Sequence, residues 1–220
     1  MPQNFIFDLD GTLVDSLPGI EYAIDAALAR SHCGPRMLNL RTVIGPPIRS
    51  ILQTLSGAYS QCELDKLELS FRSSYDTGGW RKTVCYLGAR DVLRSLFAQG
   101  KQLFLLTNKP SDATQKILHM LALRNYFKDV LTPDSSEPAF LDKPEMLRYL
   151  MGRHGIGPEE SIMVGDTAED YLAAAEVGMP AAIMAHGYGA AALVTEFPDC
   201  RLVNEFSEIT SDCLYKRRTA

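Results

Sequence analysis

Short apolar runs recur along the chain, and each of them ends at a polar residue or a turn. The clearest are residues 4–7, 102–106, 161–164 and 181–184, and residues 129–131 form a weaker candidate. Their apolar positions are continuous and do not alternate with polar ones, which is typical of strands covered on both faces. The pattern therefore predicts a sheet of buried strands.

Three amphipathic patterns lie between these runs and predict helices. Gln99-Gly100 ends the first, Ser111-Asp112 is expected to cap the second, and Pro144 suits the start of the third. The apolar positions at helical spacing are Val92, Leu93, Leu96 and Phe97; Ile117, Leu118 and Leu121; and Met146, Leu147, Leu150 and Met151. Alternation of strands and helices over residues 90–185 predicts an α/β fold with a doubly wound parallel sheet.

Residues 17–83 interrupt this alternation and show no strand pattern. Three apolar stripes at helical spacing occur there, at Ile20, Ala23, Ile24, Ala27 and Leu28; at Ile48, Ile51, Leu52 and Leu55; and at Leu64, Leu67, Phe71 and Tyr75. They predict a small all-helical domain of roughly 65 residues, inserted into an α/β core of residues 1–16 and 84–220. Because the insert follows the first strand, we expect it to cover the carboxyl edge of the sheet. The basic end, residues 216–220, is expected to be a frayed tail.

Composition narrows the class of protein. A formal charge of −5 argues against non-specific nucleic-acid binding. No apolar run approaches the ~20 residues that span a bilayer, and residues 1–4 lack the start of a signal peptide. Five widely spaced cysteines without a CxxC pair predict reduced thiols and a cytoplasmic protein, and four scattered histidines argue against a His-based metal site. The oligomeric state stays open.

Polar residues with chemical potential follow the predicted strands. Asp8 and Asp10 come after the first run, Thr107 and Asn108 after the second, and Asp166 after the run 161–164. Asp170 follows four residues later, and Lys143 precedes the helix after residues 129–131. Since ligands bind at the carboxyl ends of parallel strands, we expect these side chains to meet at one edge.

Such a set suits phosphoryl chemistry. Several carboxylates repel one another and need a cation, and an all-oxygen ligand set favours Mg²⁺. A hydroxyl, an amide and an ammonium next to that metal can neutralise phosphoryl oxygens. Asp8 and Asp10 would face the same side of an extended chain, so that one could attack while the other handles protons.

Four segments resemble the motifs of the haloacid dehalogenase superfamily. Residues 7–16 (FDLDGTLVDS) resemble its DxDGT signature, Thr107-Asn108-Lys109 its second motif, Lys143-Pro144 its third, and Gly165-Asp166-Thr167 with Asp170 its fourth. They occur in the expected order and cover almost the whole chain. The insert resembles the C1-type cap of this superfamily. Ile44-Gly45-Pro46-Pro47 and Gly187-Tyr188-Gly189 are similar to features of phosphoglycolate phosphatase-like and 5′-nucleotidase-like members.

The resemblance implies a Mg²⁺-dependent phosphatase that acts on a small phosphorylated metabolite. Asp8 would be the nucleophile that forms an aspartyl-phosphate, and Asp10 would be the general acid and base. Lys143 would hold Asp8 and the phosphate by charge. Thr107 and Asn108 would bind the phosphoryl oxygens. The metal would lie between Asp8, the Asp10 carbonyl and Asp166, with Asp170 as a weaker ligand or an orienting residue.

Several assignments stay open at this level. Lys109 is a rival to Lys143. Arg49 is a candidate for substrate binding, although a solvated surface position is the simpler reading. Asp15 and Ser16 are expected to cap the first helix of the insert. Alternative functions are a 5′-nucleotidase, a pyrophosphatase, a phosphosugar mutase, or a non-catalytic scaffold.

Overall fold

The computed structural model of the chain describes residues 1–31, 40, 48–56 and 60–210. Residues 44–47 and the basic end, both singled out above, lie outside the described residues. The chain divides into two compact units: Met1–Val14 with Cys85–Ala220, here called the core unit, and Asp15–Val84, here called the helical unit. Two short strands, β2 (Val14–Asp15) and β3 (Val84–Cys85), pair where the chain leaves the core unit and returns to it.

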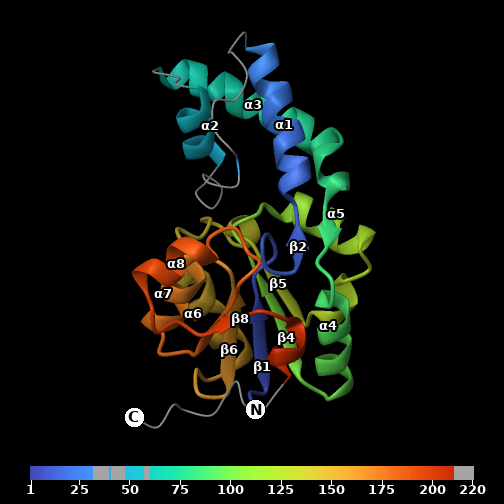
Figure 1. Cartoon of the computed structure of the whole chain (residues 1–220), viewed down its shortest axis with the longest axis vertical. Helices are drawn as coiled ribbons and strands as arrows, with labels where there is room; N and C mark the ends of the chain where they lie inside the picture. Colours follow the sequence, from blue (N-terminus) through green and yellow to red (C-terminus); the bar gives the residue numbers. More distant parts are fainter. Residues whose placement is uncertain (32–39, 41–47, 57–59, 211–220) are drawn as a thin grey trace. The chain divides into compact units, whose positions relative to one another are not determined.

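The core unit is built on a parallel six-stranded sheet with the order β5-β4-β1-β6-β7-β8 (Figure 1). The strands are β1 (Asn4–Phe7), β4 (Gln102–Leu106), β5 (Asp129–Leu131), β6 (Ser161–Gly165), β7 (Ala181–Met184) and β8 (Leu202–Val203). The five predicted strands are all present, and the α/β fold class is confirmed. The pattern missed β8, because two residues at a sheet edge are too short to show a period.

Helices follow the strands of the core unit. They are α4 (Ala89–Ala98), α5 (Ser111–Met120), α6 (Lys143–His154), α7 (Ala168–Glu176), α8 (Ala190–Glu196) and α9 (Phe206–Ile209), with 3₁₀ turns at Arg124–Tyr126 and Pro133–Ser135. The three predicted core helices correspond to α4, α5 and α6. Their lengths and positions follow from apolar stripes that need a partner surface.

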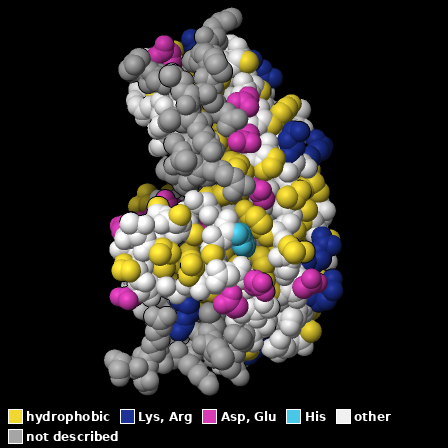
Figure 2. Space-filling view, viewed as in Figure 1, with side chains coloured by type: hydrophobic (Ala, Val, Ile, Leu, Met, Phe, Trp, Pro, Cys, Tyr) yellow, Lys and Arg dark blue, Asp and Glu magenta, His cyan; other side chains and the backbone are white. Residues whose placement is uncertain are grey.

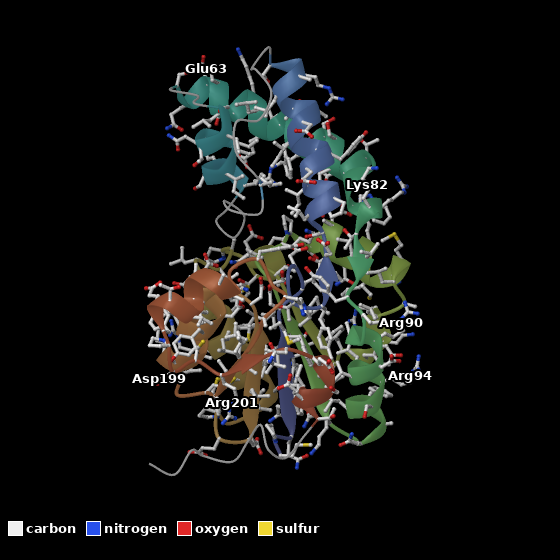
Figure 3. The ribbon with its side chains drawn as sticks, in the orientation of Figure 1. Glu63, Lys82, Arg90, Arg94, Asp199 and Arg201 are labelled. Atoms are coloured by element: carbon white, nitrogen blue, oxygen red, sulfur yellow. The ribbon has the colours of Figure 1, made fainter. Side chains whose placement is uncertain are left out.

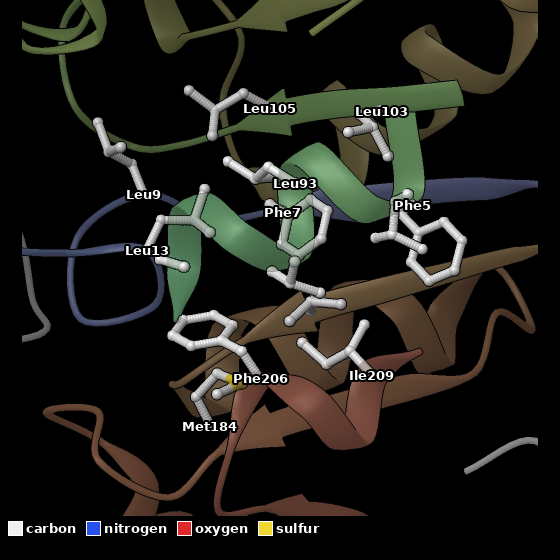
Figure 4. Packing of buried hydrophobic residues seen from close by; sticks show 14 of the residues in the cluster. Phe5, Phe7, Leu9, Leu13, Leu93, Leu103, Leu105, Met184, Phe206 and Ile209 are labelled. Atoms are coloured by element: carbon white, nitrogen blue, oxygen red, sulfur yellow. The ribbon is translucent and has the colours of Figure 1, made fainter. Parts of the chain in front are cut away.

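Apolar side chains cover both faces of the sheet, as continuous apolar strands require. Successive residues of β1 point to opposite faces: Phe5 and Phe7 pack in one cluster, and Ile6 packs in the other. The first cluster includes Leu93, Leu103 and Ile209, from α4, β4 and α9 (Figure 4). The second joins Ile6 and residues of β4 and β6 to buried side chains of α6 and α7.

Helix α4 shows its amphipathic pattern directly. Its buried residues include Val92, Leu93 and Leu96, whereas Arg94 is exposed and Arg90 donates to the Leu121 carbonyl oxygen at 2.6 Å (Figure 3). Phe97 was predicted on the apolar face but is 55% exposed, packing edge-to-face on Tyr126. The helix ends one residue later, at Ala98, so Phe97 lies in its last turn.

The predicted cap of α5 is wrong. Pro110 occupies the N-cap position, and the helix begins at Ser111. The Ser111 backbone N–H instead donates to Asp134 Oδ1 at 3.0 Å, and the Thr132 hydroxyl holds the same oxygen at 2.7 Å. The acceptor comes from the loop after β5, 23 residues away, and local spacing cannot reveal it.

The helical unit contains α1 (Leu17–Arg30), α2 (Ile48–Ser56), α3 (Gln61–Thr77) and a 3₁₀ turn at Gly79–Lys82. The three predicted stripes largely point inward, with Ile20 and Ile48 only half-buried. Ser60 and Glu63 form a capping box at the start of α3, and Arg30 links α1 to α3 by donating to the Ser74 hydroxyl at 2.8 Å. Asp15 accepts from the Leu17 N–H, as expected for a cap of α1, whereas Ser16 makes no side-chain cap bond there.

On the face shown in Figure 2, the described residues carry both acidic and basic side chains among apolar ones. Among the described helices, none combines the length and apolar character needed to cross a bilayer. The cytoplasmic location and the lack of a nucleic-acid partner stay predictions.

Burial of the central strand gives a first test. Replacing Phe7 with Ala should lower the free energy of unfolding by about 3–5 kcal/mol, because it opens a cavity between β1 and the helices on that face. The matched change Phe97→Ala removes the same ring from a half-exposed position and should cost under about 1 kcal/mol. Denaturant unfolding of both variants checks this, and equal losses would contradict the assignment of the core.

Candidate active site

Asp8 stands directly after β1, at the centre of the sheet. Its N–H donates to the Val164 carbonyl oxygen at 2.9 Å, which continues the β1–β6 ladder by one residue and fixes the backbone. The chain then turns back sharply, since the Leu13 and Val14 N–H groups both donate to the Leu9 carbonyl oxygen and Gly11 adopts a φ of +79°. The turn leaves the Asp8 carboxylate buried at the carboxyl edge.

Lys143 joins Asp8 to a second carboxylate. Its Nζ lies 3.0 Å from Asp8 Oδ1 and 2.6 Å from Asp170 Oδ1, and the residue is only 4% exposed. Lys143 is the first residue of α6. Asp142 caps the N-terminus of this helix, because its carboxylate accepts a hydrogen bond from the Glu145 N–H. The cap fixes the start of the helix, and so the direction in which the lysine extends.

Asp170 accepts hydrogen bonds at both oxygens. Oδ1 accepts from the Lys143 ammonium. Oδ2 accepts from the Asp166 N–H at 3.2 Å, the Thr167 N–H at 3.1 Å and the Thr167 hydroxyl at 2.8 Å. The carboxylate thus closes the N-terminus of its own helix, α7. Of the two roles open to Asp170, the contacts favour the orienting one.

The Asp166 carboxylate accepts one hydrogen bond at each oxygen. The Thr12 hydroxyl donates to Oδ1 at 3.0 Å, and the Tyr188 N–H donates to Oδ2 at 2.8 Å. Glycines allow this approach: a Cβ at Gly187 would lie 2.1 Å from the Asp166 Cβ, and one at Gly11 would lie 2.3 Å from Oδ2. Sequence reasoning missed Thr12 and the Tyr188 N–H as partners of Asp166, although both lie within stretches singled out above.

Thr107 and Asn108 follow β4, the neighbour of β1. Thr107 is buried, and its Oγ1 accepts from the Lys109 N–H at 3.3 Å. Asn108 is exposed, and its amide donates to the Glu169 carboxylate. Both stand at the predicted edge of the sheet, and their role toward a phosphoryl group stays a prediction.

Asp10 has a lysine of its own. Lys109 Nζ lies 2.8 Å from Asp10 Oδ2 and 3.1 Å from Oδ1. The two lysines considered above are therefore partners of different carboxylates, Lys143 of Asp8 and Lys109 of Asp10. Spacing alone does not reveal the second pair, because 99 residues separate its members.

Arg49 lies on α2, in the helical unit. Its guanidinium pairs with Asp65 at 2.7 Å and with Glu68 at 2.9 Å, both on α3. Hydrogen bonds to these carboxylates raise the pKa of Arg49. Its substrate-binding role stays a prediction.

Comparison with known proteins adds an independent finding. Residues 5–184 match the family of haloacid dehalogenase-like hydrolases. The chain belongs to this family. It is similar to a phosphoglycolate phosphatase of Pseudomonas fluorescens, at 29% identity over 97% of this chain and 80% of the relative. A phosphoglycolate phosphatase of Vibrio vulnificus is 34% identical, with 83% of each chain covered.

Solved structures agree with the fold of a haloacid dehalogenase-like hydrolase. One from Streptococcus pneumoniae has a TM-score of 0.83 at 27% identity, covering 94% of this chain and 96% of that one. A predicted phosphoglycolate phosphatase from Haemophilus somnus gives the same score, identity and coverage.

The electrostatics of this hydrolase site favour a bound cation. Burial raises the pKa of Asp8 to about 7. The charge of Lys143 lowers this pKa, and the neighbouring carboxylates raise it and so offset part of the effect of Lys143. Burial and the charges of Asp170 and Asp8 likewise raise the pKa of Asp166. Burial works against the charged form of Lys143, but Asp170 and Asp8 outweigh it and raise its pKa. Three buried carboxylates thus face one buried ammonium.

The donor chemistry fits a hard divalent ion. One oxygen from each of Asp8, Asp166 and Asp170 can be chosen so that all three lie within 4.8 Å of one another. Oxygen donors of this kind suit Mg²⁺, which keeps part of its water shell. A cation there would stabilise the charged carboxylates against burial and against their mutual repulsion, which together raise the pKa of Asp8 and of Asp166.

The contact of Gly165 with Asp170 gives a second test. A Cβ at Gly165 would lie 2.2 Å from Asp170 Cγ, so Gly165→Ala must displace the carboxylate that holds Lys143 and the start of α7. We expect a loss of about 1–3 kcal/mol in the free energy of unfolding. Gly152→Ala, in α6 with open space around it, should be neutral or slightly stabilising. Denaturant unfolding of the pair checks this, and a neutral Gly165→Ala would refute the tight packing.

The raised pKa of Asp8 gives a third test. Without metal, the folded chain retains a proton on Asp8 up to about pH 7, whereas the unfolded chain releases it near the ordinary value of 3.8. The free energy of unfolding should therefore fall as the pH rises between these values. Because Mg²⁺ would replace this proton, it should raise the melting temperature more at about pH 8 than at about pH 5. Melting curves with Mg²⁺ and with a chelator check this, and an equal gain at both pH values would contradict it.

Proposed function

We propose that this hydrolase is a Mg²⁺-dependent phosphatase that cleaves a small phosphate monoester of the phosphoglycolate type through an aspartyl-phosphate on Asp8. One observation carries the proposal: the buried Asp8 carboxylate is held 3.0 Å from the buried Lys143 ammonium, next to Asp166. The similarity to proteins named phosphoglycolate phosphatase supports the substrate class.

In the first step, an Asp8 carboxylate oxygen attacks the phosphorus atom, and the bond between phosphorus and the ester oxygen breaks. The electron pair of that bond stays on the ester oxygen, and Asp10 gives it a proton, so the leaving group departs as an alcohol. Lys143 keeps the Asp8 carboxylate in place and offsets the negative charge that the phosphoryl group brings.

In the second step, Asp10 takes a proton from a water molecule whose oxygen attacks the phosphorus atom. The bond between phosphorus and Asp8 breaks, which releases inorganic phosphate and restores the Asp8 carboxylate and the protonated Asp10. Thr107 and Asn108 would donate hydrogen bonds to the phosphoryl oxygens in both steps. For this, Asn108 would turn its amide away from Glu169.

Asp8, the Asp10 carbonyl and Asp166 would hold the Mg²⁺ ion. When bound, the ion supplies positive charge that offsets the oxygens of the phosphoryl group. Thr12 and the Tyr188 N–H fix the Asp166 carboxylate for this purpose. Asp170 would act mainly through Lys143, because its Oδ1 accepts from that ammonium at 2.6 Å and its Oδ2 accepts three hydrogen bonds, whereas each oxygen of Asp166 accepts one.

The helical unit would serve as the cap that selects the substrate, as the C1-type resemblance implies. Two of its arginines, Arg49 and Arg72, share Glu68, and a second anionic group on the substrate could take the place of this carboxylate. A nucleoside monophosphate, pyrophosphate and a sugar phosphate are therefore the comparison substrates against phosphoglycolate.

Phosphate release with these substrates, with and without Mg²⁺, tests the proposal. Wild type should release phosphate only with Mg²⁺, and Asp8→Asn should lower kcat by about 10⁴-fold or more, because it removes the nucleophile. The matched control Asp91→Asn changes an exposed carboxylate on α4 and should keep full activity. Substantial turnover by Asp8→Asn would refute the nucleophile, and full activity in a chelator would refute the metal. Isomerised sugar phosphate without free phosphate would establish a mutase instead.

A further inference from the structure

The carboxylate assigned to proton transfer has a partner that the mechanism above does not use. Lys109 Nζ lies within hydrogen-bond distance of both oxygens of Asp10, at 2.8 Å and 3.1 Å. In the part of the chain that the structure describes, Lys109 is the side chain that pairs with the Asp10 carboxylate. The Asp10 side chain is 23% exposed and that of Lys109 is 7% exposed, so the ammonium lies beneath the carboxylate that it holds.

The backbone of Lys109 is anchored on both sides. Its N–H donates to Thr107 Oγ1, and its carbonyl oxygen accepts from the Thr114 hydroxyl at 3.2 Å. Thr107 is buried after β4, and Thr114 is buried in α5. The lysine therefore extends from a segment fixed by both a strand and a helix, which sets the point from which its side chain reaches Asp10.

Asp10 itself lies at a sharp turn, where its backbone forms an isolated bridge with Val14 that leaves its side chain unfixed. Gly11, with its positive φ, follows immediately, and Asp10 stands three residues beyond the end of β1. A carboxylate on a turn can adopt several side-chain rotamers, whereas proton transfer needs one of its oxygens within about 3 Å of the leaving oxygen.

We propose that Lys109 is a positioning residue for the phosphatase reaction, which holds Asp10 so that one carboxylate oxygen faces the leaving group. The assignment rests on the proposed function. The ammonium needs only one of the two oxygens, and the other stays available to give a proton to the ester oxygen and later to take one from water. Each aspartate of the reaction then has its own lysine, and the two ammonium groups do different work.

Two other roles for Lys109 predict different kinetics. A lysine that bound the phosphoryl group would affect every phosphate substrate equally, through KM and through inhibition by inorganic phosphate. A lysine that only stabilised the fold would lower the melting temperature and the activity on all substrates together. A lysine that positions the proton donor matters most where the leaving group needs a proton.

The test compares two small substrates with different leaving groups, phosphoglycolate and acetyl phosphate, in the full chain with Mg²⁺. An alkoxide needs protonation to leave, whereas acetate does not. The measured quantity is kcat/KM, which reports the steps up to phosphorylation of Asp8. Lys109→Met should lower it by about 10- to 100-fold for phosphoglycolate and by less than about threefold for acetyl phosphate.

Hydrolysis of the aspartyl-phosphate also needs Asp10, which gives a second readout. With acetyl phosphate, Lys109→Met should accumulate phosphorylated enzyme, detected after acid quenching. Lys109→Arg keeps the charge and can donate to both oxygens, so it should restore most of the activity. Lys116→Met, which removes an exposed lysine paired with Asp112 on α5, is the matched control and should behave as wild type.

The outcomes separate the two proposals. Equal losses on both substrates, or a raised inhibition constant for inorganic phosphate with no difference between leaving groups, would overturn the role of Lys109 while leaving the phosphatase intact. Wild type that released no phosphate from either substrate would overturn the proposed function itself. A selective loss on phosphoglycolate, with rescue by arginine, would establish the positioning role.

Discussion

The site depends on one electrostatic constraint: three carboxylates are buried around a single buried ammonium. Lys143 contacts Asp8 and Asp170 directly, and Asp166 lies beside them. Buried charge is costly unless it is paired and hydrogen-bonded, so the surroundings supply donors. The Thr12 hydroxyl and the Tyr188 N–H serve Asp166, and the first turn of α7 serves Asp170. The negative charge that remains unpaired is what makes the site suited to a divalent cation and a phosphoryl group.

The parallel sheet makes this concentration of charge possible. β1 lies between β4 and β6, so residues that follow three strands meet at one edge although the chain separates them widely. The apolar clusters on both faces fix the strands, and the ladder bond of the Asp8 N–H carries that rigidity to the first charged residue. Glycines at positions 11, 165 and 187 then admit the carboxylates at distances that any Cβ would block. The rigid strands and the room left by these glycines together hold the carboxylate oxygens close to one another in spite of their repulsion.

The two lysines of this haloacid dehalogenase-like hydrolase contact different carboxylates. Lys143 is buried deeply, begins a capped helix and joins two carboxylates, which suits a permanent countercharge to the nucleophile. Lys109 is also buried but contacts a partly exposed carboxylate on a turn, which suits the alignment of a group that must exchange protons with substrate and water. The two lysine side chains are similarly buried, and what differs is the exposure of their partners: the Asp8 side chain is 7% exposed and the Asp10 side chain is 23% exposed. This difference agrees with the different roles proposed for two residues of the same type.

The sequence by itself determined the elements and the residues at their ends. Continuous apolar runs predict β1, β4, β5, β6 and β7, because a strand buried on both faces needs apolar residues at successive positions. The polar residues directly after a strand can likewise be identified from a short stretch of sequence. Only the tertiary structure decided the partners. Lys109 with Asp10, Thr12 with Asp166 and Asp134 at the start of α5 join residues 99, 154 and 23 positions apart. Such pairs depend on strand order and loop path, which no local period encodes, and the same holds for the choice between two lysines at one edge.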